Sequence, residues 1–61
     1  LSTTNVEILM YLTNGFKVSE IAKIIGFSGG AIQKRVNKML KEFQVENYHE
    51  LIRLAIKMKL F

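Results

Sequence analysis

Residues 29–43 carry the pattern that most limits how this chain can fold. Apolar side chains recur there at the spacing of one face of an α-helix, namely Ile32, Val36, Met39, Leu40 and Phe43. The opposite face of that helix carries Gly30, Lys34, Asn37, Lys38 and Lys41. One face is therefore suited to burial, and the other is basic and bears an amide. We hypothesise that the basic face enters DNA.

The positive charge of the chain is concentrated on this predicted helix. The sequence has nine Lys and Arg residues, five acidic residues and a formal net charge of +4. Four of the basic residues lie between positions 34 and 41, where no acidic residue occurs, and the other five are matched by the five Glu. A basic surface on a single helix favours a polyanionic partner. The alternative interpretation is a cationic face that is only solvated.

The chain is long enough for one small domain, which we expect to be all-α. It has no proline, and no alternation typical of strands is evident. Gly15 and Gly26 mark helix ends, while Ser2 (or Thr3), Ser28 and Asn47 are suited to N-caps. The predicted architecture is a compact four-helix domain with helices at about 3–14, 18–25, 29–43 and 48–59.

The second and third predicted helices form a helix-turn-helix, in which the second helix of the motif is the one that reads DNA. Gly29 and Gly30 occupy the start of that reading helix. Each glycine costs about 1 kcal/mol relative to alanine in a helix. Two interpretations follow. Either the helix starts nearer Gly30, or bare backbone there allows close approach to a phosphate.

The predicted fourth helix has two apolar stripes. The first should pack on the other helices and consists of Tyr48, Leu51, Ile52 and Ala55. The second follows a spacing of i, i+3, i+7 and i+10 and consists of Leu51, Leu54, Met58 and Phe61. A monomer of this size has difficulty covering both stripes. We predict that the second is a dimer interface, the alternatives being a frayed C-terminus or contact with a further domain.

These residues resemble the LuxR/GerE-type helix-turn-helix domain, the C-terminal output domain of many bacterial response regulators. Gly15 followed by Glu20-Ile21-Ala22 is similar to the family's Gly-x-x-x-x-Glu-Ile-Ala, and Phe27-Ser28 to its Ile-Ser. The further similar positions are Leu1-Ser2, Glu7-Ile8-Leu9, Ile32, Val45 and Ala55. Each match is short, but the ordered set covers essentially the whole chain.

The chain also departs from the family at positions that matter for DNA. Lys17 stands where the family usually has Ser, and Ala31 where it has Thr. Gln33 replaces the usual Lys, Arg35 the usual His, and Glu42 a Lys. The helix face stays basic, while its base-contacting chemistry differs from the usual one.

The resemblance implies which residues contact DNA. The groove-facing positions of the family fall on Gln33, Lys34 and Asn37. Lys can donate to guanine O6 and N7, and Gln or Asn can pair with adenine N6 and N7. We expect phosphate contacts, which hold the register of the protein on DNA, from Lys17, Ser28, Arg35, Lys38 and Lys41. The resemblance also makes the fourth helix the dimer contact.

The expected partners are double-stranded DNA and a second copy of the chain. Because the first residue is not Met, we expect a fragment of a longer cytoplasmic regulator, with a receiver or sensor domain before Leu1. No apolar run reaches the roughly 18 residues of a membrane span. The chain has no Cys and a single His, so we expect no catalytic site, no metal and no cofactor.

Two alternatives remain open. The segment from Gly26 to Arg35 also resembles region 4 of bacterial sigma factors, and Arg35 fits that pattern better than the LuxR type. The C-terminal third favours the LuxR type because it continues as that family's fourth helix. The other alternative is a helical protein-interaction module that has lost DNA reading, with exposed apolar residues at Met10, Ile24, Leu54 and Met58.

Overall fold

The computed structural model describes residues 1–60, which form four helices and no strand. The helices are α1 (Thr3–Thr13), α2 (Val18–Ile25), α3 (Gly29–Glu42) and α4 (Tyr48–Met58). The predicted all-α fold and the order of its helices are confirmed. Three helices end one residue earlier than predicted because Asn14, Phe43 and Lys59 are their C-caps.

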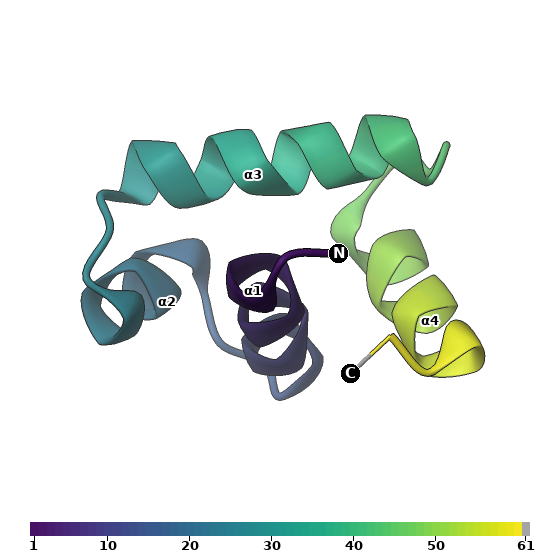
Figure 1. The fold of residues 1–61 in the computed structure, drawn as a ribbon, viewed down its shortest axis with the longest axis horizontal. Coiled ribbons are helices and arrows are strands. Elements are labelled where there is room, and N and C mark those ends of the chain that lie inside the picture. Colours follow the sequence, from purple (N-terminus) through teal and green to yellow (C-terminus); the bar gives the residue numbers. More distant parts are fainter. Residues whose placement is uncertain (61) are drawn as a thin grey trace.

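The longest helix, α3, lies across one side of the molecule, and the other three helices pack beneath it (Figure 1). In this view α1 lies between α2 and α4. The first and last helices contact each other, and α2 contacts α3. The core between the helices receives side chains from all four and consists of Ile8, Leu9, Leu12, Ile21, Ala22, Ile32, Val36, Met39, Leu51 and Ala55.

The helix starts are fixed by short polar side chains that accept hydrogen bonds from free backbone N–H groups. Ser2 Oγ accepts from Asn5 N at 3.1 Å, which makes Ser2 rather than Thr3 the cap of α1. Asn47 Oδ1 accepts from Glu50 N at 3.0 Å and caps α4. These predicted caps are confirmed.

Helix α3 begins at Gly29, with Ser28 as its N-cap accepting from Ala31 N at 3.1 Å. The interpretation that the helix starts nearer Gly30 is therefore wrong. Both glycines are exposed, and a Cβ at either would meet nothing within 4 Å. The start of α3 is thus bare backbone open to solvent, as close approach to a phosphate would require.

The variant Gly30→Ala is expected to stabilise the domain by about 0.5–1 kcal/mol, because alanine loses less backbone entropy in a helix. Its thermal midpoint should rise by roughly 2–8 °C in a domain of this size. The matched control is Gly26→Ala. A Cβ at Gly26 would likewise meet nothing within 4 Å, but the φ of Gly26 is +87°. Because a residue with a Cβ is strained at that φ, this variant should destabilise the domain. Thermal unfolding followed by circular dichroism measures both, and changes of the same sign would contradict the assignment.

Candidate nucleic-acid interface

The turn between α2 and α3 sets how α3 is presented. Gly26 closes α2 in the left-handed conformation, with a φ of +87°. The backbone N–H groups of Gly26 and Phe27 both donate to Ala22 O at 2.9 Å. Ala22 itself is buried, so its small side chain lets the two helices pack closely. This tight turn orients α3 relative to α2 as a helix-turn-helix requires.

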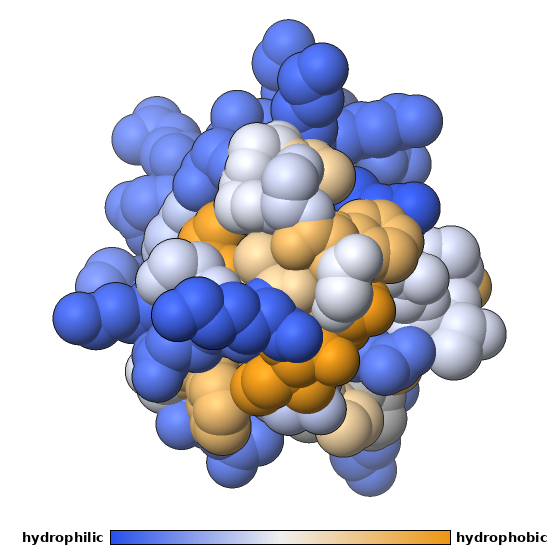
Figure 2. Space-filling view, turned by 90° about the vertical axis from the view of Figure 1, so that its left-hand side faces the viewer, coloured by the Kyte–Doolittle hydropathy of each residue, from blue (hydrophilic) through white to orange (hydrophobic). Residues whose placement is uncertain are grey.

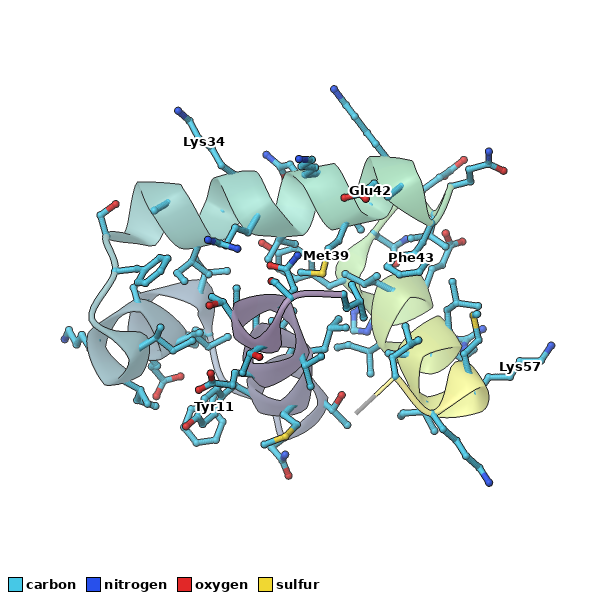
Figure 3. The ribbon with its side chains drawn as sticks, viewed as in Figure 1. Tyr11, Lys34, Met39, Glu42, Phe43 and Lys57 are labelled. Carbon is cyan, nitrogen blue, oxygen red and sulfur yellow. The ribbon has the colours of Figure 1, made fainter. Side chains whose placement is uncertain are left out.

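The two faces of α3 separate as predicted. Ile32, Val36 and Met39 are buried on the inner face. The outer face is exposed at Gly30, Lys34, Asn37, Lys38 and Lys41. Figure 3 shows Lys34 extending away from the other helices, whereas Met39 points toward them. The outer face therefore presents three lysines and one carboxamide on a rigid, outward-facing helix.

Gln33 is placed differently from the other two predicted base-contacting residues. It is half-buried, and its Oε1 accepts a hydrogen bond from the Tyr48 hydroxyl at 2.8 Å. Its Nε2 donates to Asn37 Oδ1 at 3.0 Å. Both polar atoms of the Gln33 amide thus bond to other side chains of the domain, while Lys34 and Asn37 remain exposed. Sequence reasoning placed Tyr48 only in an apolar stripe and missed its polar contact with α3.

Arg35 also makes contacts inside the domain. It is half-buried, and its Nη1 donates to Asn5 Oδ1 at 3.2 Å. Its guanidinium carbon lies 5.3 Å from the centre of the Phe27 ring, within the range of a cation–π contact. Arg35 therefore links α3 to the start of α1 and to the turn after α2. A guanidinium carries five N–H donors, so a phosphate contact from Arg35 stays a prediction.

The remaining predicted phosphate contacts lie on the surface. Lys17 is exposed immediately before α2, and Lys38 and Lys41 are exposed on α3. Ser28 is exposed too, with its hydroxyl oxygen accepting from the first turn of α3. Their roles toward DNA stay predictions.

The predicted dimer surface on α4 needs one correction. Leu51 is fully buried in the domain's own core, so its assignment to a dimer interface is wrong. The other stripe residues differ in placement: Leu54 is half-buried, Met58 is 54% exposed, and Phe61 lies outside the described residues. An open groove runs along this side of α4, lined by Val45, Glu50, Arg53, Leu54 and Lys57.

Large apolar side chains are exposed at the opposite end of the domain as well. Figure 2 faces the end formed by α2 and the α2–α3 turn, where an apolar area is bordered by hydrophilic side chains. Ile24 is 49% exposed, and Phe16 and Phe27 are about as exposed as Met10. The predicted exposure of Met10 and Ile24 is confirmed, whereas Phe16 and Phe27 were missed as surface residues.

Within residues 1–60, none of the helices combines the length and the apolar character that crossing a membrane requires. In that same stretch, His and acidic side chains form no group of three or more that could hold a metal ion.

Comparison with known protein families gives a match over most of the chain. The family model described as "Bacterial regulatory proteins, luxR family" matches residues 1–55, which include the whole of α1, α2 and α3 and most of α4. No curated protein and no solved structure gives a significant match.

Proposed function

Since the chain belongs to the luxR family of bacterial regulatory proteins, we propose that it binds double-stranded DNA sequence-specifically, with α3 in the major groove. The family consists of DNA-binding regulators of transcription that use a helix-turn-helix, and it is not a family of enzymes. One observation carries the proposal: the outer face of α3 is exposed, basic and free of acidic side chains from Gly29 to Lys41.

Lys34 and Asn37 are the main base-reading residues in this proposal. Both are exposed on the same outward face of α3, one helical turn apart. A lysine ammonium donates to guanine O6 or N7, and a carboxamide can donate to a purine N7 and accept from adenine N6. Gln33 lies beside them, and its bonds to Tyr48 and Asn37 leave it one amide N–H for a base.

The lysines hold the helix on the DNA backbone. Lys38 and Lys41 continue the basic face along α3, and Lys17 adds a charge before α2. The open backbone at Gly29 and Gly30 lies at a helix N-terminus, where free N–H groups and the helix dipole favour an anion. Such contacts fix the register of the protein on DNA but carry little sequence information.

We further propose that two copies pair through α4 on a two-half-site duplex. The surface consists of Leu54 and Met58 beside the groove that Glu50, Arg53 and Lys57 line. A two-fold axis places this surface against the same surface of the other copy, so Glu50 of one copy can pair with Arg53 or Lys57 of the other. In this proposal the chain is the DNA-binding part of a longer bacterial response regulator, with a receiver or sensor domain, acting in the cytoplasm.

The test of DNA binding is a titration of the 61-residue chain with duplex DNA over a range of salt concentrations. Each neutralised phosphate contributes about −0.9 to the slope of log K against log salt concentration, so three lysine contacts give a slope near −3. A duplex selected from a random library should bind more tightly than a shuffled one. A slope near zero, or no binding at low salt, would contradict the proposal.

The dimer surface is tested with Leu54→Asp/Met58→Asp. This double variant should weaken binding to a duplex with two half-sites by about 10²-fold, because it removes the affinity gained when two paired copies bind the two half-sites together. Affinity for a duplex with a single half-site should be unaffected. The matched control is Ile56→Asp, since Ile56 and Met58 are both 54% exposed but lie on different faces of α4. Equal effects of the double variant on both duplexes would rule out the interface.

The exposed apolar residues at the α2 end support the protein-interaction module as a second candidate function. Phe16, Ile24 and Phe27 are each at least 36% exposed. The end of the domain that Figure 2 faces carries an apolar area that the DNA-binding proposal leaves unused. The comparison of the selected with the shuffled duplex separates the two functions, because a module that has lost DNA reading retains at most non-specific binding and shows no preference between them.

A further inference from the structure

A hydrogen-bonded chain of three polar side chains joins α4 to the outer face of α3. The Tyr48 hydroxyl donates to Gln33 Oε1 at 2.8 Å, and Gln33 Nε2 donates to Asn37 Oδ1 at 3.0 Å. Tyr48 and Gln33 are half-buried, whereas Asn37 is exposed. The chain therefore starts inside the domain and ends at a side chain that the proposed function places against a base.

With the Tyr48 hydroxyl as donor, the order of donors and acceptors in this chain sets the orientation of Asn37. A carboxamide can turn by 180° and exchange its oxygen, which accepts, for its NH₂ group, which donates. The Tyr48 hydroxyl holds the oxygen end of Gln33, so the NH₂ end of Gln33 faces Asn37. With Tyr48 donating, Asn37 therefore accepts with its Oδ1. Its own NH₂ group is then free on the exposed side of α3.

We propose that Tyr48 is a positioning residue for base recognition: acting through Gln33, it makes Asn37 present hydrogen-bond donors to the DNA. The proposal rests on the proposed function. In the major groove, guanine offers two acceptors, N7 and O6, whereas cytosine offers only the N4 donor. The base facing Asn37 should therefore be guanine in preference to cytosine. A carboxamide without this constraint can also turn its oxygen outward and accept from cytosine N4.

The variant Tyr48→Phe removes the hydroxyl and keeps the ring that packs against the core. Binding sites are selected from a random duplex library by the wild-type chain and by the variant, and single-base changes are then measured by competition. The guanine-over-cytosine preference should fall by about 2- to 10-fold at one position only, the factor that corresponds to one neutral hydrogen bond. Affinity for shuffled duplex and the salt slope should be unchanged.

The matched control is Tyr11→Phe, which removes the hydroxyl of the chain's other tyrosine. Tyr11 lies on α1, on the side of the domain away from α3 (Figure 3). This variant should give the wild-type base profile at every position. A change of the profile in Tyr11→Phe like that in Tyr48→Phe would overturn the proposal, because the effect would then not depend on the bonded chain.

The variant Gln33→Glu tests the direction of the chain and also carries the test if Tyr48→Phe fails to fold. A carboxylate can accept from Tyr48 but has no N–H for Asn37. Asn37 should turn, donate its NH₂ to the carboxylate and present its oxygen outward. The preferred base at that position should then change from guanine toward cytosine or adenine, which offer amino donors. The added negative charge lowers affinity for all sequences alike, so the relative preference is the measurement.

The outcomes separate this proposal from the proposed function. If the wild-type chain binds DNA and the base profiles of Tyr48→Phe and Gln33→Glu are unchanged, only the proposed role of Tyr48 is overturned. The same conclusion follows if these variants lose affinity equally for every base at every position. No DNA binding by the wild-type chain overturns both. A readout without DNA is the side-chain amide NMR signals of Gln33 and Asn37. They should shift in Tyr48→Phe and stay in place in Tyr11→Phe, and unchanged signals in both would overturn the bonded chain.

Discussion

Replacing Leu51 with alanine is expected to lower the free energy of unfolding by about 2–5 kcal/mol. Leu51 is 0% exposed, and its loss leaves a cavity among the buried side chains of the core. A domain this small has only a few kcal/mol of stability, so Leu51→Ala should be largely unfolded near room temperature. Circular dichroism during thermal and urea unfolding measures the change.

The matched control for Leu51→Ala is Leu54→Ala, the same substitution one turn along α4. Leu54 is half-buried and lines the open groove, so its truncation should cost clearly less. In the proposed dimer, Leu54→Ala instead weakens binding to the two-half-site duplex. Similar losses of stability in the two variants would mean that α4 packs in a different rotation from the one described.

The triple variant Lys17→Ala/Lys38→Ala/Lys41→Ala is expected to lower affinity for every duplex by roughly 10²- to 10³-fold near 0.1 M salt. Its slope of log K against log salt concentration should be less steep by about 3, because three phosphate contacts are lost. The base preference should stay as in the wild-type chain, since phosphate contacts position the protein without reading sequence. Fluorescence anisotropy with labelled duplex at several salt concentrations measures all three quantities.

The control is a second triple variant, Lys23→Ala/Lys57→Ala/Lys59→Ala. It changes the net charge by the same amount, but its three exposed lysines lie away from the outer face of α3. Lys57, for example, points outward from α4 (Figure 3). This control is measured on a duplex with a single half-site, because Lys57 lines the proposed dimer surface. It should change the slope little there, because its lysines neutralise no phosphate in the proposed complex. Equal losses in the two triple variants would mean that overall charge, and not the face of α3, governs binding.

The parts of the fold that depend on near neighbours in sequence were predictable. The caps at Ser2, Ser28 and Asn47 each involve a backbone N–H three positions along the chain. The inner stripe of α3 also follows from local spacing alone. The luxR family match supports the LuxR type over the sigma-factor alternative, as the C-terminal third of the sequence had suggested.

Contacts between residues far apart in the sequence were not predictable. Leu51 belongs to both apolar stripes of α4, and spacing cannot tell which stripe faces the core, because the rotation of α4 depends on α1 and α3. The bond between Arg35 and Asn5 spans 30 positions, and that between Tyr48 and Gln33 spans 15. Neither pair has a local signature. These contacts bear most directly on the candidate site, because they involve two of its predicted DNA-contacting residues.

The contact between the first and last helices has a consequence for the order of folding. Helices α2 and α3 are adjacent in sequence and need only a short turn to meet, so they can assemble with little loss of chain entropy. Helices α1 and α4 meet only when the intervening chain has closed into a loop, which is slower. The helix-turn-helix is therefore the element suited to form early, and docking of α4 completes the core and brings Tyr48 within reach of Gln33.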